Sequence, residues 1–581
     1  MDSERSECRV LTGLAASSGI AVGRLQVVDR RRHIIDEYSI SAETVSDQIG
    51  RITNAFTSTR EEMEALRQHL EAKAGNDHLF IIDAHLLILS DDHLLTETCA
   101  IIESHHINAE AALQRVLQRY RSLFAQIEDE YLRERISDIE TVVERVLSAM
   151  VGSAPAAIIS TDGHTIIAAH DLTPADILQL DRSRVVGIVT EIGGRASHTS
   201  ILARAFELPA VIGVEGCADT ALDGLPGVVD GIAGKLIINP GSDTFRECLQ
   251  RKQRFDYVEH ELLKTADLPP VTLDGHRLTL KGNVEIPEEG PSVLRHGGEG
   301  SGLYRTEMLF MGRQDMPGEE EQYQVYSAMQ RAVAPHPLTI RTLDAGGDKL
   351  MEGGHSREQN PALGVRAIRL ALGIPDEFRK QLRAILRLSA SGPVRVMFPM
   401  ISGLEELRQA KELLDEVRAE LDAEGIAYDR SMPVGIMIEV PSAVQIADLL
   451  ARESDFFSVG TNDLIQYSLA IDRSSEQLAA MFQPLHPAVL RSLRSVVTAA
   501  QQAGIPASIC GEMAGDPFYL PLLLGLGFDE LSMSAGAIPR VKQVLRSLTR
   551  ARAVEIAETC LGFSTAVEVE AFLRSTLEVK R

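Results

Sequence analysis

Short apolar runs and long amphipathic stretches follow one another along this chain in distinct blocks. Residues 11–29, "LTGLAASSGIAVGRLQVVD", combine small apolar side chains with turn glycines, as is typical of short strands. Residues 40–150 instead repeat apolar side chains at intervals of three or four, which predicts long amphipathic helices. Residues 151–240 return to short strand-like runs around a glycine-rich loop. This order predicts a β/α domain into which a helical bundle is inserted.

From about residue 270 the pattern becomes a strand followed by a helix, repeated to the end of the chain. Eight apolar runs have the length of buried strands: LTLKGNV, GSGLYRTE, LTIRTLDAGGD, VRVMFPMI, VGIMIEV, FFSVGTNDL, PASICGE and ELSMSA. Eight such units in about 310 residues predict a (β/α)8 barrel of the TIM type. The charged stretch 246–267 is expected to form one helix that links the two halves. The expected fold class is therefore multidomain α/β.

Composition narrows the class of protein and of partner. The chain has 581 residues, of which 44% are hydrophobic, as expected for a soluble globular protein. The formal net charge of -25 disfavours nucleic acid and anionic membrane as partners and favours a basic protein. Its six cysteines contain no C-x-x-C pair, which suits a reducing compartment. The charged N-terminus and the absence of a long apolar run predict a cytoplasmic protein.

A histidine, His198, stands at the predicted start of a helix, directly after the glycine loop of "EIGGRASHTS". A helix start offers unpaired N–H groups and a positive dipole end, so it suits an anion such as phosphate, which an imidazole can also carry. Arg195 and Arg204 flank this position. The alternative is that Ser197 or Thr199 is an ordinary N-cap with His198 as a surface neighbour.

Polar residues stand where the predicted barrel strands end. They are Asn283, Arg305, Arg341, Asp344, Glu439, Asn462, Asp463 and Cys510. Glu439 and Asp463 are hard oxygen donors on adjacent strands, which suits one Mg²⁺ that also takes substrate oxygens. Arg305, Arg341 and Arg473 offer the forked donors that match phosphate and carboxylate groups. The implied substrate is small, doubly anionic and metal-bound.

Cys510 ends the seventh predicted strand, within "SICGEMAG". On the residues alone it is either a buried structural thiol or a thiol that faces the same pocket and gives a proton to a substrate carbon.

Several long motifs resemble Enzyme I of the bacterial phosphotransferase system, the phosphoenolpyruvate–protein phosphotransferase family. "GGRASHTSILAR" resembles its phosphohistidine signature and "DFFSVGTNDLIQYSLAIDR" its second signature, while GLYRTEMLFM, RTLDAGGDK, NPALGVRAIR, IMIEVPSA and CGEMAGD are similarly close. The resemblance runs from about residue 9 to the C-terminus, in the same order. It implies the following division: a phosphohistidine swivelling domain at 1–35 and 151–245, a helical domain that binds the carrier protein HPr at 36–150, a linker helix at 246–268, and a phosphoenolpyruvate-binding and dimerisation barrel at 269–581.

The resemblance also implies a role for each candidate residue. His198 would take the phosphoryl group from phosphoenolpyruvate and pass it to a histidine of HPr, in the first step of sugar uptake. Phosphoenolpyruvate would be held by Arg305, Arg341, Asn462, Asp463 and Arg473. Glu439 and Asp463 would bind Mg²⁺, and Cys510 would be the proton donor that yields pyruvate. A homodimer without nucleic acid or membrane insertion is expected.

Two features of the chain depart from the family's pattern. Many members have threonine where this chain has Ala196, and the stretch after Lys349 is more polar and glycine-rich than expected.

Phosphoenolpyruvate synthase and pyruvate phosphate dikinase are alternative classes that share the motifs. They need a further nucleotide-binding domain, and the helical segment of this chain has no glycine-rich phosphate loop. A regulatory protein that binds without turnover is disfavoured because every candidate catalytic residue is present. A nitrogen-regulatory paralogue stays open.

Overall fold

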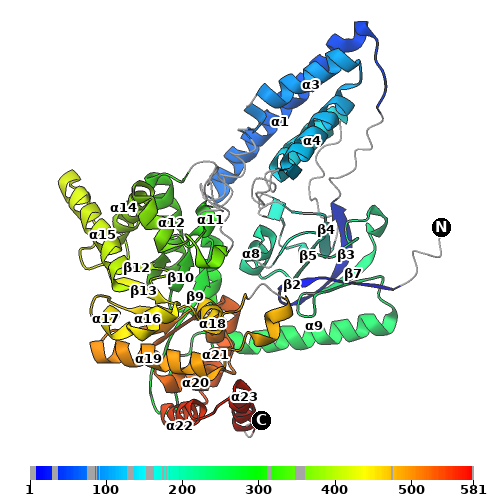
Figure 1. Cartoon of the computed structure of the whole chain (residues 1–581). Helices are drawn as coiled ribbons and strands as arrows, with labels where there is room; N and C mark the ends of the chain where they lie inside the picture. Colours follow the sequence, from blue (N-terminus) through cyan, green and yellow to red (C-terminus); the bar gives the residue numbers. More distant parts are fainter. Residues whose placement is uncertain are drawn as a thin grey trace. The chain divides into compact units, whose positions relative to one another are not determined.

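The structure is a computed structural model. It describes residues 8–28, 37–74, 86, 88–90, 92–126, 136–151, 163–172, 176–177, 180–181, 183–194, 197–310, 316–346, 360–472 and 476–578. The chain divides into two compact units, Met1–Tyr257 and Val258–Arg581 (Figure 1).

The first unit contains a mixed sheet. Its strands are β1 (Arg9–Thr12), β2 (Leu14–Ser17), β3 (Ile20–Val28), β4 (Thr165–Ala169), β5 (Val185–Thr190), β6 (Ala210–Ile212), β7 (Pro226–Asp230) and β8 (Lys235–Ile238), in the order β1-β8-β7-β3-β4-β5-β6-β2. Strands β3 to β6 run parallel, and the helix α8 (His198–Ala205) crosses over between β5 and β6. The glycine loop therefore lies at the carboxyl end of β5. The predicted strand "AAIIST", residues 156–161, falls outside the described residues.

Helices of the first unit come between β3 and β4 in the sequence. They are α1 (Val45–Ala74), α3 (Asp92–His105), α4 (Ala109–Gln126) and α6 (Ile136–Val151). Their apolar faces share one core that includes Ile52, Phe56, Ile102, Val116 and Val143. The amphipathic period therefore predicted the helical nature of this insertion correctly. Within the stretch 108–150 the described residues form α4 and α6.

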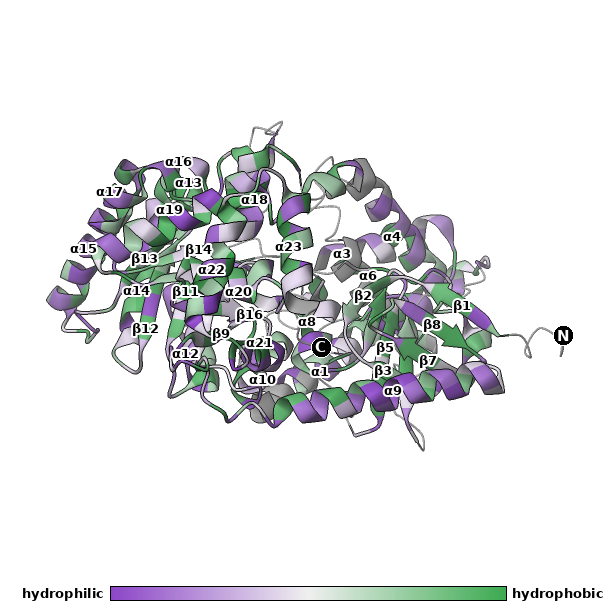
Figure 2. Cartoon of the chain, turned by 90° about the horizontal axis from the view of Figure 1, so that it is seen from below, coloured by the Kyte–Doolittle hydropathy of each residue, from purple (hydrophilic) through white to green (hydrophobic). Residues whose placement is uncertain are grey.

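The second unit is a closed barrel of parallel strands. Its strands are β9 (Thr279–Val284), β10 (Ser301–Arg305), β11 (Leu338–Arg341), β12 (Val394–Phe398), β13 (Val434–Ile438), β14 (Phe457–Val459), β15 (Ala507–Ile509) and β16 (Glu530–Met533). Each pairs with the next, and β16 closes the ring on β9. Each strand falls within one of the eight predicted runs, so the (β/α)8 prediction is confirmed. In Figure 2 the strands are mostly hydrophobic, because helices cover them on the outside.

Two apolar cores hold the barrel together. Outward-facing strand residues such as Tyr304 and Phe398 pack with the surrounding helices. Alternate residues form a separate cluster of Leu303, Met397, Met437, Phe456 and Cys510, which fills the interior. The polar strand ends stand on this packed interior, so their backbone positions are fixed.

The helix α9 (Ser242–Leu263) follows the sheet and leads into the barrel. It begins four residues before the predicted linker 246–268 and ends five residues before its end. Figure 2 shows hydrophilic and hydrophobic residues alternating along it, as expected for a helix with one buried face. None of the described helices is both long and apolar enough to span a bilayer.

Candidate active site at the barrel mouth

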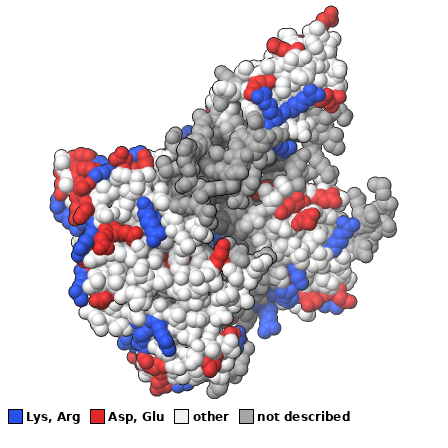
Figure 3. Space-filling view, viewed as in Figure 1, with Lys and Arg blue, Asp and Glu red and all other residues white. Residues whose placement is uncertain are grey.

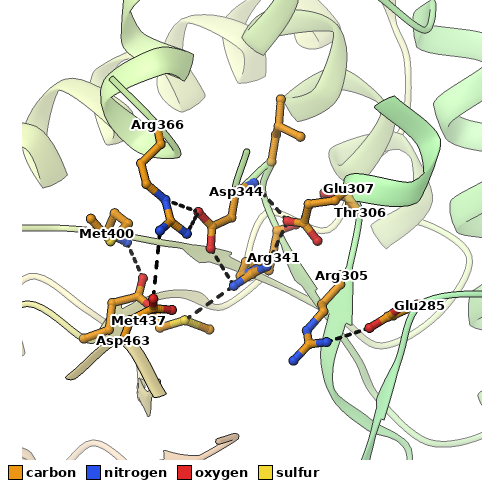
Figure 4. Close-up of polar contacts among 12 residues, drawn as sticks. Glu285, Arg305, Thr306, Glu307, Arg341, Asp344, Arg366, Met400, Met437 and Asp463 are labelled. Atoms are coloured by element: carbon orange, nitrogen blue, oxygen red, sulfur yellow. Dashed lines mark hydrogen bonds and ion pairs between the residues drawn. The ribbon is translucent and has the colours of Figure 1, made fainter. Parts of the chain in front are cut away.

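The carboxyl ends of the barrel strands gather most of the predicted site residues (Figure 4). Arg305 ends β10 and Arg341 ends β11, while Glu439 and Cys510 come directly after β13 and β15. Asp463 stands in the first turn of α18 (Thr461–Leu469), which follows β14. Parallel strands of a closed barrel bring their carboxyl ends to one rim, so these side chains lie together.

Arg341 is the buried centre of this cluster. Its guanidinium contacts Glu307 Oε1 at 2.9 Å and Asp344 Oδ2 at 2.7 Å, and the residue is 8% exposed. Asp344 in turn accepts from Arg366 Nη2 at 2.7 Å. Burial opposes the charge of Arg341, but the two carboxylates outweigh it and raise the Arg341 pKa. Buried charges persist when they are paired in this way, so Arg341 is held charged and fixed.

Burial shifts the pKa values of the carboxylates in opposite directions, depending on their partners. For Asp344 burial favours the neutral acid, but Arg341 and Arg366 overcome that effect and lower its pKa. For Glu307 burial dominates over the attraction of Arg341 and raises its pKa. For Glu439 burial, with Asp344 and Asp463 nearby, raises the pKa to about 8. Burial therefore favours the neutral acid at Glu307 and Glu439, whereas the two guanidinium groups keep Asp344 ionised.

Glu439 and Asp463 each have a buried carboxylate oxygen that fits the binding of a divalent cation. Glu439 Oε1 accepts a hydrogen bond from the Met400 N–H at 2.6 Å, but its Oε2 is buried and has no hydrogen-bond partner among the described residues. Asp463 Oδ1 is also buried without a hydrogen-bond partner among the described residues, and Arg366 Nη1 lies 3.9 Å from it. A Cβ on Gly460 would lie 2.6 Å from Glu439 Oε2, so glycine at this position keeps that oxygen from being crowded.

Two carboxylates alone do not complete a metal site. Among the described residues no group of three or more His, Cys, Asp or Glu side chains has the geometry to hold a metal ion. Mg²⁺ commonly takes one or two carboxylates and fills its other positions with water and substrate phosphate. The two orphaned oxygens fit that pattern.

Arg305 and Asn462 complete the described part of the mouth. Arg305 Nη1 contacts Glu285 Oε1 at 2.6 Å, and the Arg305 side chain is 41% exposed. Asn462 Oδ1 accepts from the Glu512 N–H at 3.4 Å, which ties it to the turn after β15. Arg305 is therefore more exposed than Arg341 and Arg366, the other described arginines of the cluster.

Cys510 is held in place through its backbone and its sulfur. Asn283 Nδ2 donates to the Cys510 carbonyl at 2.9 Å, and Ser532 Oγ donates to Asn283 Oδ1 at 2.6 Å. The thiol approaches the Val459 carbonyl at 3.5 Å. Burial raises the Cys510 pKa to about 11, so the thiol keeps its proton at neutral pH. A protonated thiol at this position is chemically suited to donate a proton.

The histidine loop of the first unit has the predicted helix start. Helix α8 begins at His198, and Ser197 is the N-cap, whose side chain accepts from the Ser200 N–H at 3.3 Å. Thr199 is not a cap; its hydroxyl donates to the Leu172 carbonyl at 3.1 Å. Gly193 has φ +119°, a conformation that favours glycine. Ser197 as N-cap is compatible with either interpretation of His198.

Some predicted positions cannot be placed. The side chain of His198 lies outside the described part of the structure, as do Arg195, Ala196, Arg473 and the stretch that follows Lys349 up to residue 359. The roles assigned to His198 and Arg473 therefore stay predictions.

Two residues of the cluster were missed in the sequence. Glu307 begins α11 (Glu307–Phe310), and Arg366 precedes α13 (Ile368–Gly373), so neither ends a strand. Both lie in motifs that carry the family resemblance, GLYRTEMLFM and NPALGVRAIR, which was the available signal.

Comparison with known proteins first gives the class. Family models of PEP-utilising enzymes match residues 12–135 (N-terminal), 161–234 (mobile domain) and 259–550 (PEP-binding domain). The last match covers the barrel, so the chain belongs to the class of phosphoenolpyruvate-utilising enzymes.

Individual relatives then give the family. The phosphoenolpyruvate-protein phosphotransferase of Priestia megaterium is 41% identical over 98% of this chain and 99% of its own length. That of Bacillus subtilis is 39% identical over 98% of this chain and 100% of its own length. An Enzyme I protein solved in solution by NMR is 30% identical, covers 42% of this chain and 99% of its own, and has a TM-score of 0.36. The chain belongs to the phosphoenolpyruvate-protein phosphotransferase family and is a transferase.

Proposed function

We propose that this enzyme moves the phosphoryl group of phosphoenolpyruvate to His198 and then to a histidine of HPr, with release of pyruvate, as the first step of sugar uptake by a phosphotransferase system. The observation that carries the proposal is the barrel mouth, where the paired guanidinium groups of Arg341 and Arg366 stand in one cluster with two buried carboxylate oxygens that lack hydrogen-bond partners among the described residues. The relatives' shared name supports a protein as the phosphoryl acceptor.

Substrate binding is assigned to the arginines and the amide of the mouth. Arg305, Arg341 and Arg473, with Asn462, would hold the phosphate and carboxylate of phosphoenolpyruvate by charge-assisted hydrogen bonds. Asp463 would contribute to this site as well as to the metal. Glu439 and Asp463 would hold Mg²⁺, which when bound offsets the negative charge of the phosphoryl oxygens.

The reaction at phosphorus leaves a carbon to be protonated. An imidazole nitrogen of His198 forms a bond to phosphorus while the bond between phosphorus and the enol oxygen breaks, and the electron pair stays on the enolate. Cys510 gives its proton to the terminal carbon, which yields pyruvate, and the thiolate regains a proton from solvent. Asn283 fixes the Cys510 backbone at 2.9 Å during this step.

The acceptor side is assigned to the helices of the first unit. Helices α1, α3, α4 and α6 would dock HPr, and the barrel would form a homodimer in the cytoplasm. Figure 3 shows acidic and basic side chains mixed on the visible face of the bundle. Within the bundle Arg51 pairs with Glu110 at 2.5 Å. The net charge of -25 nevertheless favours steering of a basic carrier.

Radiolabel transfer tests the proposal. The full chain, given phosphoenolpyruvate labelled on phosphorus together with Mg²⁺, is expected to form an acid-labile phosphoprotein, and His198→Ala is expected to form none. Purified carriers are then added one at a time. Label on a sugar-type HPr supports the proposed pathway, whereas transfer only to a nitrogen-regulatory carrier refutes it. A His198→Ala variant that still carries label would refute the assignment of the acceptor residue.

A further inference from the structure

Glu285 pairs with Arg305, the most exposed of the described arginines discussed at the barrel mouth. It follows β9 directly, and the pairing of Val284 with Tyr304 places Glu285 beside Arg305 on the neighbouring strand. The contact of 2.6 Å is thus set by strand register as well as by side-chain conformation. Glu289 Oε2 accepts from the Glu285 N–H at 2.6 Å and fixes the backbone there. Figure 4 shows this pair standing apart from the Arg341 cluster.

The pair differs from the other ion pairs of the site in its exposure. The Arg341 side chain is 10% exposed, and its partners Glu307 and Asp344 are 15% and 2% exposed. The Arg305 side chain is 41% exposed and Glu285 19%. A buried pair is costly to separate, whereas a solvent-accessible pair is weak and exchanges its partner readily. Arg305 is thus the guanidinium that an incoming anion reaches most easily, and Glu285 already neutralises it.

We propose that Glu285 is a displaceable counter-ion for Arg305, which an anionic substrate must displace and which returns when the product leaves. The inference rests on the proposed function, because it takes Arg305 as part of the phosphoenolpyruvate site. A ligand that binds only the free fraction of a group has its apparent affinity reduced by that fraction. Glu285 therefore weakens binding of both phosphoenolpyruvate and pyruvate, and it favours release of product.

Titration calorimetry on the full chain tests this inference. The His198→Ala background stops turnover, and phosphoenolpyruvate or pyruvate is titrated with Mg²⁺ present. An accessible ion pair is weak, so adding Glu285→Gln is expected to lower the dissociation constant of phosphoenolpyruvate by about two- to fivefold. Glu285→Ala, which also removes the hydrogen-bond acceptor, is expected to do at least as much. In the His198-containing enzyme the same change is expected to lower KM without raising kcat.

Glu299→Gln is the matched control. Glu299 pairs with Arg277 at the start of the barrel strands, so the variant loses the same charge and the same kind of ion pair away from the mouth. It is expected to leave phosphoenolpyruvate binding unchanged. Unchanged or weaker binding in Glu285→Gln, with normal binding in the background protein, would overturn the counter-ion role alone. Absence of binding in the His198→Ala background itself would overturn the proposed site and this inference together.

Discussion

Replacement of Cys510 by serine separates the two chemical tasks of the proposed reaction. The residue is 3% exposed, and burial raises its pKa to about 11, so the thiol holds a transferable proton throughout the neutral range. General acid catalysis contributes ~10²–10⁴-fold, so Cys510→Ser is expected to slow pyruvate formation by about that factor. Phosphorylation of His198 in a single turnover is expected to persist, because the roles proposed for Arg305 and Arg341 in stabilising the phosphoryl charge do not involve the thiol.

The raised pKa also fixes the sign of the pH dependence. An ordinary thiol, with a pKa of about 8.5, loses half of its acid form at that pH. Because burial raises the Cys510 pKa to about 11, its acid form persists as pH rises through 8.5 and is lost only near pH 11. We therefore expect no loss of pyruvate formation from this group between about pH 7 and 9. A fall in the rate of pyruvate formation near pH 8.5 that the parent shows and Cys510→Ser does not would contradict this pKa.

Cys560→Ser is the matched control for this experiment. Cys560 lies in α22 (Arg550–Leu561), is 1% exposed, and also has its pKa raised to about 11 by burial. The two variants therefore make the same replacement of a buried thiol, but only one of them at the mouth. Rapid-quench measurement of phosphohistidine and pyruvate is expected to show a defect in Cys510→Ser alone. Parental rates of pyruvate formation in Cys510→Ser would show that Cys510 is a core thiol.

Three further predictions concern the metal and the carrier. Asp463→Asn removes one charged oxygen from the proposed Mg²⁺ site, so the Mg²⁺ concentration needed for phosphorylation is expected to rise sharply. An unchanged Mg²⁺ requirement would show that the metal binds elsewhere. Gly460→Ala is expected to act in the same direction without a change of charge, because its Cβ would lie 2.6 Å from Glu439 Oε2, and a Mg²⁺ titration equal to that of the parent would contradict this. Association with HPr, followed by stopped flow, is expected to slow as salt rises beyond the ~10 Å screening regime near 0.1 M, whereas a salt-independent rate would indicate an apolar interface.

The sequence predicted the barrel well because its strands are buried on both faces. Such strands read as nearly continuous apolar runs, and each of the eight runs contains one strand of the closed ring. The amphipathic period likewise predicted the helices of the insertion, where the described residues form α4 (Ala109–Gln126) and α6 (Ile136–Val151), because the period reports the buried face of a helix.

The site was predictable only where strand position determines side-chain position. Arg341 and Cys510 were identifiable because a parallel barrel brings strand ends together. Arg366 reaches Asp344 from a segment that precedes α13, and its placement depends on how that segment folds over the mouth. The pairing of Glu285 with Arg305 depends on the register between β9 and β10, which no single strand encodes.

The balance of charge at the mouth explains why a strongly acidic protein needs more than arginines to hold an anion. Arg305, Arg341 and Arg366 stand among five carboxylates: Glu285, Glu307, Asp344, Glu439 and Asp463. The guanidinium groups are thus compensated before any substrate arrives, and burial, with Asp344 and Asp463 nearby, raises the pKa of Glu439 to about 8. A divalent cation that accompanies a phosphate ester into this described part of the mouth would add the positive charge that the paired guanidinium groups do not leave free. Binding of cation and substrate must then be mutually favourable, since a coupling free energy between two ligands is reciprocal. The ion pair between Glu285 and Arg305 is the contact of the mouth that the substrate replaces at the lowest free-energy cost, because it is the most exposed of the described pairs there.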